Sequence, residues 1–182
     1  MSNSLIQIKN EFQNIKANPP FGFGLDVGLP EGDYYHWIST MMGPQDTPYR
    51  GGIFWIDIRF PKDYPEHAPE VKFLTPIYHI NVKHTNTGSE PLGHICMNTL
   101  GQWNKTYSIS RVLQEVYALM YLGNEQSPYG LDRQKEFTHN KALYDEKATY
   151  FTKMYANANQ TGGQQFSEWN FNYQQQQQPQ QE

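Results

Sequence analysis

Apolar residues recur at helical spacing near the start of the chain. They fall three or four positions apart, on one face of a helix, and are Leu5, Ile8, Phe12 and Ile15. This spacing predicts an amphipathic helix over residues 4–17. The pair Pro19-Pro20 ends the helix, because proline has no backbone N–H and its ring clashes with the preceding turn.

Between residues 34 and 74 apolar and polar positions alternate, which is typical of strands. This alternation predicts three strands, over residues 34–42, 53–60 and 71–74. A fourth, weaker strand is predicted before them, within residues 21–27. Turn residues rich in Gly, Pro and Asp separate the stronger segments. Sequential strands with short connections favour an antiparallel meander.

Regular periodicity is missing from residues 75–107, and this stretch holds the only cysteine of the chain, Cys96. A loop of such length inside a compact domain is usually functional or disordered, and the cysteine favours function. Helical spacing returns after Ser108, a residue type that caps helix N-termini, with an apolar stripe at Ile109, Val112, Leu113, Val116 and Met120. A short helix is predicted over residues 131–137, and a last helix after Asn140 with its core-packing face at Leu143, Lys147, Tyr150, Phe151 and Met154.

Composition divides the chain into a domain and a tail. Residues 1–158 have the apolar and aromatic content of one folded domain, whereas residues 159–182 are rich in glutamine, which predicts a disordered tail. Aromatic residues are unusual in such a tail, and here they are Phe166, Trp169, Phe171 and Tyr173. They indicate either a weakly collapsed tail or a docking segment for a partner.

Charge and cysteine content exclude several classes of function. The net charge is -4 and no basic patch stands out, so we expect no nucleic-acid partner. Apolar runs are too short for a membrane span, and the N-terminal residues do not resemble a secretory signal. A single cysteine cannot form an internal disulfide, which favours a reducing compartment, cytoplasmic or nuclear or both.

Cys96 is the candidate nucleophile. A lone cysteine is more often an inert small apolar residue, but Cys96 follows Gly93 in an irregular region where a substrate can approach closely. Upstream stand His79 and Asn81, separated by Ile80. A thiol that attacks a carbonyl builds negative charge on oxygen, which an asparagine amide can stabilise, and a histidine can hold such a loop in shape.

A larger set of short motifs follows the same order as in one known family. The central set is Tyr64-Pro65, Pro69, Phe73, residues 77–81, Gly93, Ile95-Cys96, Leu100, Trp103 and Thr106-Tyr107. The upstream set is His36-Trp37, residues 42–44, Asp46, Pro48-Tyr49, Gly51-Gly52 and Phe54. From about Leu5 to Tyr155 the chain resembles the ubiquitin-conjugating enzyme family.

The resemblance implies an α+β fold: an N-terminal helix, a four-stranded antiparallel meander sheet, a long irregular active-site loop and C-terminal helices. It implies that Cys96 accepts ubiquitin, or a ubiquitin-like protein, from an activating enzyme as a thioester. The thioester then passes to a substrate lysine, usually with a ubiquitin ligase. Asn81 would stabilise the oxyanion or order the loop, His79 would be structural, and Ser127 would lie near the incoming lysine. No metal or organic cofactor is implied.

The chain departs from the family pattern in several places. Ile80 replaces the usual proline, and Asn81 and Cys96 are fifteen positions apart, more than is usual. The extra residues lie within 82–92 and make Asn86 a rival for the role of Asn81. The remaining departures are Glu66 at a common ligase contact, Asn104-Lys105 in place of Ser-Pro, and only Lys9 and Lys16 as basic residues in the first helix.

Three alternatives stay open at this point. The first is a catalytically inactive protein of the same fold that serves as a scaffold or structural subunit of a larger assembly. The second is a metal site, for which the candidate ligands are His67, His79, His84, His94 and Cys96. The third is a cysteine protease in which His94, two positions before Cys96, points the same way on an extended segment.

Overall fold

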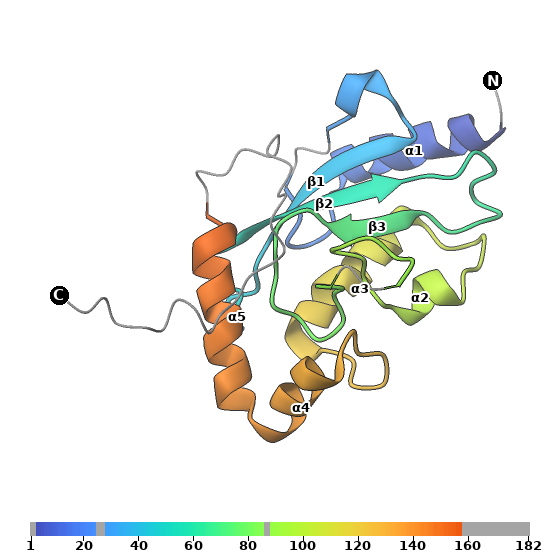
Figure 1. Cartoon of the computed structure of the whole chain (residues 1–182). Helices are drawn as coiled ribbons and strands as arrows, with labels where there is room; N and C mark the ends of the chain where they lie inside the picture. Colours follow the sequence, from blue (N-terminus) through green and yellow to red (C-terminus); the bar gives the residue numbers. More distant parts are fainter. Residues whose placement is uncertain (1–2, 25–27, 86–87, 158–182) are drawn as a thin grey trace.

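The computed structural model describes residues 3–24, 28–85 and 88–157. In chain order its elements are α1 (Asn3–Ala17), the short 3-10 helix η1 (Pro30–Gly32), β1 (His36–Met42), β2 (Ile53–Arg59), β3 (Glu70–Phe73), α2 (Asn98–Gly101), α3 (Ile109–Leu122), α4 (Leu131–His139) and α5 (Lys141–Tyr155). Figure 1 shows α1 at one end of the sheet, α3 running along it, and α4 and α5 as neighbours at the opposite end. The α+β class expected from the sequence is confirmed.

The sheet is antiparallel with the order β1-β2-β3, as the alternation predicted. The expectation of a fourth strand is wrong for the part of the chain that the structure describes. Phe23 and Gly28 each form only an isolated bridge, to Met41 and Ile38 of β1. Backbone hydrogen bonds from Gly24 to Thr40 and between Gly28 and Ile38 keep this segment beside β1, but the bridges are single and no continuous ladder joins them in the described residues.

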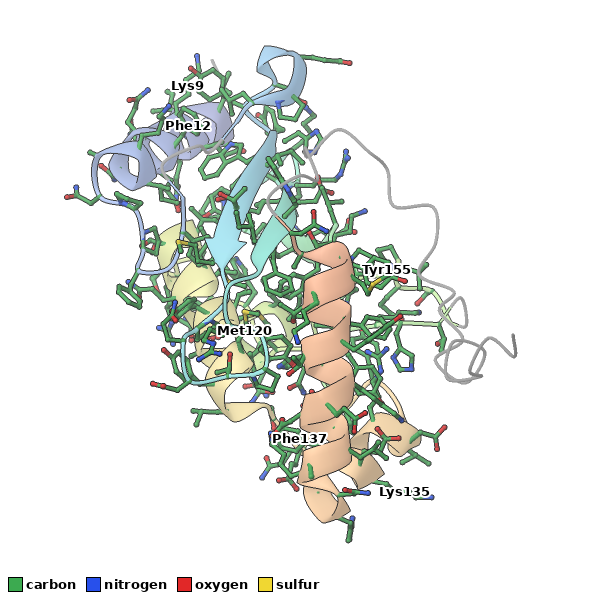
Figure 2. The ribbon with its side chains drawn as sticks, turned by 90° about the vertical axis from the view of Figure 1, so that its left-hand side faces the viewer. Lys9, Phe12, Met120, Lys135, Phe137 and Tyr155 are labelled. Atoms are coloured by element: carbon green, nitrogen blue, oxygen red, sulfur yellow. The ribbon has the colours of Figure 1, made fainter. Side chains whose placement is uncertain are left out.

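The core lies between the sheet and α3. The predicted stripe on α3 is fully buried, and its members are Ile109, Val112, Leu113, Val116 and Met120. The predicted cap is also present, because the Ser108 hydroxyl accepts a hydrogen bond from the backbone N–H of Arg111 at 3.3 Å. Figure 2 shows Phe12 of α1 and Met120 of α3 along this interior, and Phe137 on α4 at its far end. The helix α3 thereby forms the base on which the loops at residues 75–107 rest.

The helix α5 buries a face one position away from the predicted one. Its buried residues are Tyr144, Ala148, Phe151 and Thr152, whereas Met154 is 43% exposed. A hydrogen bond explains the difference, because the Tyr144 hydroxyl must face the core to accept from the backbone N–H of Ile80 at 2.9 Å. An apolar pattern alone does not show that a tyrosine supports a loop far away in the sequence.

No helix within the described ranges combines the length and the apolar character needed to cross a membrane.

Candidate active site

Cys96 lies on one of two irregular segments that pair side by side. The backbone N–H of Cys96 donates to the carbonyl of Asn81 at 2.9 Å, and Lys83 N–H donates to the carbonyl of His94 at 2.9 Å. Asn81 and Cys96 are therefore neighbours despite their separation in sequence. The extra residues lie between Lys83 and Gly93, outside the paired part of the two segments. Asn86, the rival for the role of Asn81, lies outside the described residues.

Side chains alternate between the two sides of the segment that carries Cys96. Ile95 and Met97 are buried, whereas His94 and Cys96 are partly exposed. His94 and Cys96 therefore face the same side, as successive outward residues of an extended chain do. The thiol is accessible, while its two neighbours in sequence anchor it to the core.

The Asn81 side chain holds the loop that follows α3. It is fully buried, and its Nδ2 donates to the carbonyls of Asn124 at 2.7 Å and Ser127 at 2.8 Å. Its Oδ1 accepts from the backbone N–H of Asn124 at 2.7 Å. Both amide hydrogens are thus used by the protein itself, so donation to an oxyanion would require one of these bonds to be given up. The contacts favour loop ordering among the two roles considered for Asn81.

His79 connects Asn81 to the helix α3. Nε2 of its buried ring donates to the carbonyl of Leu119 on α3 at 3.0 Å, and Nδ1 accepts from the backbone N–H of Asn81 at 3.0 Å. Burial lowers the pKa of His79 to about 4, more than the Leu119 carbonyl raises it, so the ring is neutral near pH 7. These contacts support the structural role expected from the resemblance.

Ile80, which stands where the family usually has proline, uses a backbone group that proline lacks. Its N–H donates to the Tyr144 hydroxyl on α5, and its carbonyl accepts from the backbone N–H of Tyr129 at 2.8 Å. The side chain is fully buried, and Gly123 packs so closely on it that an added Cβ would lie 3.2 Å from Ile80 Cγ2. The loop is therefore held by hydrogen bonds and packing where a proline ring would otherwise restrict it.

Tyr129 was missed by the sequence analysis, which placed Ser127 near the incoming lysine. In the contacts described, Ser127 contributes its backbone carbonyl to Asn81. Tyr129 contributes a side chain, since its hydroxyl lies 2.5 Å from Nδ1 of His94. Burial, and then the negative charge of an ionised Cys96, raise the pKa of Tyr129 to about 12. No sequence signal marks this contact, because it depends on how the loop after α3 folds back.

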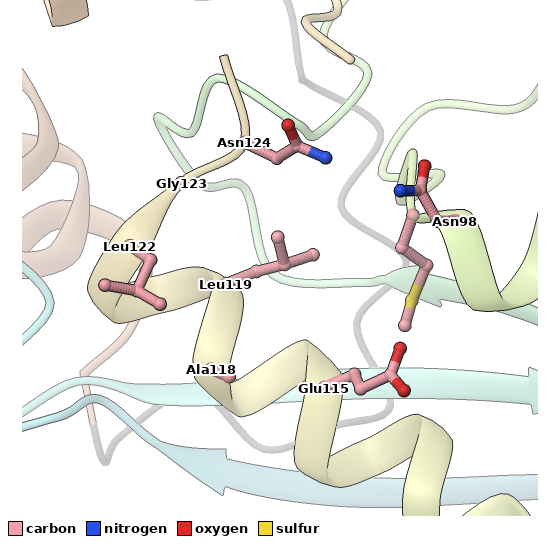
Figure 3. A pocket seen from close by; sticks show the side chains of 8 residues that line it. Asn98, Glu115, Ala118, Leu119, Leu122, Gly123 and Asn124 are labelled. Atoms are coloured by element: carbon pink, nitrogen blue, oxygen red, sulfur yellow. The ribbon is translucent and has the colours of Figure 1, made fainter. Parts of the chain in front are cut away.

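A pocket of about 290 Å³ lies between α3 and the residues that follow Cys96 in the chain. It is lined by the residues that follow the cysteine, Met97 and Asn98, and by the last turns of α3. Figure 3 shows Leu119 and Glu115 projecting from α3 toward the segment that carries Asn98. The wall formed by Leu119 and Leu122 is apolar.

Three of the candidate metal ligands, His67, His79 and His94, have other hydrogen-bond partners. His67 lies on the surface with Nδ1 2.6 Å from an Asp63 carboxylate oxygen, far in the chain from Cys96, and His79 and His94 bond to the groups named above. In the described ranges, three or more His, Cys, Asp or Glu side chains do not gather as a metal site. For the cysteine-protease alternative, the printed side-chain partner of His94 is the Tyr129 hydroxyl and not the Cys96 thiol.

We expect the free energy of unfolding to fall as the pH drops from about 6.5 to about 4. Burial lowers the pKa of both His79 and His84 to about 4, with the positive charge of Arg133 as a further cause. Unfolded histidines titrate near pH 6.5, so in this window the unfolded chain binds more protons and acid favours unfolding. For the fully buried His79 the full effect is about 3 kcal/mol.

Thermal melting across this pH range measures the effect. His79→Gln should flatten the dependence relative to the wild type, whereas the surface variant His67→Gln should leave it unchanged. An equal slope in His79→Gln and the wild type would show that His79 does not contribute to it.

These features define an α+β domain in which one accessible cysteine is held beside a buried His-Ile-Asn loop. The sequence profile of the ubiquitin-conjugating enzyme family matches residues 7–152, and the chain belongs to this family. "Ubiquitin-conjugating enzyme E2 T" of Danio rerio is 36% identical over 155 residues, which cover 82% of this chain and 75% of that protein. A crystal structure of a provisionally assigned ubiquitin conjugating enzyme from Plasmodium yoelii is similar with a TM-score of 0.75 and 27% identity, covering 86% of this chain and 97% of that one.

Proposed function

We propose that this protein is an active conjugating transferase that carries ubiquitin, or a ubiquitin-like protein, as a thioester on Cys96 and passes it to a lysine. The observation that carries the proposal is the pairing of Cys96 with Asn81, which puts the only cysteine of the chain on the accessible side of a buried, ordered loop. The family implies the partners: the modifier, an activating enzyme, a ligase and a substrate.

The proposed reaction is two acyl transfers. In the first, the Cys96 thiolate attacks the thioester carbonyl carbon of the charged activating enzyme, whose thiol leaves. In the second, a lysine amine attacks the new thioester and Cys96 leaves as thiolate. Asn81 and His79 hold the loop after α3 beside the reacting sulfur. The pocket at Met97 and Leu119 would accommodate part of the polypeptide attached to Cys96.

The departures from the family pattern leave this geometry in place. The longer loop leaves and rejoins the paired segments without separating Asn81 from Cys96. Glu66 and Lys105 form an exposed ion pair at 3.2 Å, which alters the surface of a common ligase contact and not the surroundings of the thiol. The sequence features that favoured an inactive scaffold therefore bear on the choice of partner.

Incubation with an activating enzyme, its modifier and ATP tests the proposal. Ubiquitin and several ubiquitin-like proteins would each be offered with their own activating enzyme, and the products separated on gels with and without reducing agent. We expect one modifier to give an adduct that thiols remove. If none charges the protein while a known conjugating enzyme is charged in parallel, the scaffold alternative is correct.

A further inference from the structure

Two titratable side chains from distant parts of the chain meet beside Cys96. His94 lies two positions before the cysteine, and Tyr129 lies in the loop between α3 and α4. The Tyr129 hydroxyl is 2.5 Å from Nδ1 of His94, and the rings meet edge to face with their centroids 5.8 Å apart. The loop ordering described above does not require this contact, because Tyr129 is already anchored through its backbone N–H.

We propose that Tyr129 and His94 form a proton relay that accepts the proton of the incoming amine when the thioester on Cys96 is discharged. This inference rests on the proposed function, since it concerns the second acyl transfer. Tyr129 is the catalytic residue of the pair, because its hydroxyl would touch the amine. His94 acts through Tyr129 as the final proton acceptor.

The placement of the pair fits this role. His94 and Cys96 face the same side of an extended segment, ~7 Å apart along the chain. Tyr129 also lies near enough to Cys96 for the charge of an ionised thiol to raise the pKa of its hydroxyl. Its position is fixed twice, by the backbone bond from Tyr129 to the carbonyl of Ile80 and by the bonds of Asn81 to the same loop.

The proton transfers balance as follows. The nitrogen of the neutral amine forms a bond to the thioester carbonyl carbon, and as its positive charge builds it gives a proton to Tyr129 Oη. Tyr129 passes its own hydroxyl proton to Nδ1 of His94. The carbon–sulfur bond then breaks and Cys96 leaves as thiolate, so one amide, one thiolate and one imidazolium result. The imidazolium returns its proton to the thiolate or to solvent.

The charges around His94 suit a neutral base near pH 7. Burial lowers its pKa, the carboxylates of Glu90 and Glu70 act in the opposite direction, and the ammonium of Lys83 lowers it further. Lys72 is the bridge partner of His94, and its ammonium lies 3.6 Å from an Asp57 carboxylate oxygen. His94 is therefore unprotonated at neutral pH and free to take up a proton from Tyr129.

Single-turnover discharge of purified, charged full-length protein tests the relay. Three variants are compared: Tyr129→Phe removes the hydroxyl, His94→Gln keeps an acceptor for it but takes up no proton, and Tyr34→Phe is the control. The Tyr34 ring lies against Phe12 of α1, remote from the site, and a phenylalanine keeps that contact. Charging and thermal melting are measured first for each variant.

With free lysine we expect Tyr129→Phe and His94→Gln to discharge about 100-fold more slowly than the wild type, with charging unchanged. The rate is then followed with methoxyamine, a weakly basic amine that stays neutral over most of the range from about pH 5 to pH 8. Wild type and Tyr34→Phe should slow at acid pH as His94 takes up a proton, below the range in which an ordinary histidine titrates, because burial lowers the pKa of His94. Both relay variants should lose this acid limb, the decrease in rate at acid pH.

The relay is wrong if either variant discharges like the wild type, or if only the KM for the amine rises while the acid limb stays. Discharge at the wild-type rate would show that the pair has no role in the reaction. A raised KM with the acid limb kept would show that the pair only positions the amine. Failure of the wild-type protein to charge at all would instead contradict the proposed function, so the two failures are distinguishable.

Discussion

Cys96→Ala is expected to abolish adduct formation with the modifier completely, and Cys96→Ser to give an adduct that thiols do not remove. Cys96 is the only thiol of the chain, so no second cysteine can take its place. An alanine has no nucleophile, whereas a serine hydroxyl forms an oxygen ester that resists thiol exchange. The measurement is the charging assay on gels with and without reducing agent.

Thermal melting provides the control for this substitution. Cys96 is only partly buried and its contacts to Asn81 are made by the backbone, so Cys96→Ala should melt within a few degrees of the wild type. A thiol-sensitive adduct on Cys96→Ala would place the acceptor on another residue. A folded Cys96→Ser protein with no ester, beside normal wild-type charging, would contradict only the expectation for serine.

Asn81→Ala is expected to slow discharge to lysine about 100-fold and also to lower stability. The side chain is fully buried and makes three hydrogen bonds to residues 124–127, so its loss leaves buried backbone groups without partners. Such a loss costs about 1 to 3 kcal/mol. The loop also carries Tyr129, and a shift of about 1 Å in a catalytic group costs about that factor in rate.

Comparison of variants separates the two roles of Asn81. Asn10→Ala, on the exposed side of α1, is the matched control and should change the free energy of unfolding by less than about 0.5 kcal/mol. Slow discharge with unchanged melting in Asn81→Ala would indicate that the amide acts directly on the oxyanion. Normal discharge together with reduced stability would leave Asn81 a purely structural residue.

Local patterns predicted the elements well, and contacts between distant segments explain what they missed. The stripe on α3 and its Ser108 cap follow from spacing alone, since both depend on residues a few positions apart. The fourth strand is reduced to two single bridges to β1 in the described residues, and an apolar pattern does not distinguish such bridges from a strand. The buried face of α5 was displaced by Tyr144, whose partner is 64 positions away.

The site divides in the same way. Cys96, Asn81 and His79 could be found because their residue types suggest chemistry and because they stand in the same order as in the ubiquitin-conjugating enzyme family. The partners of Asn81 could not, because they are backbone groups of residues 124–127 that any sequence would supply. Tyr129 could not be found either, since the turn that brings it to His94 is set by tertiary packing. The expectation for the Ser127 side chain stays a prediction.

The bond between Ile80 and Tyr144 makes the effect of a substitution at one position depend on the residue at the other. Tyr144 accepts from Ile80 N–H and lies 3.3 Å from the Tyr49 hydroxyl, which donates to the carbonyl of Tyr78 at 2.9 Å. A proline at position 80 would restore the usual family residue but would remove the donor at the start of this chain of hydroxyls, inside the core. The cost of placing proline at position 80 therefore depends on whether the Tyr144 hydroxyl is present, so the two positions are energetically coupled. The residue that looks most like a deviation from the family pattern is thereby fitted to this particular core.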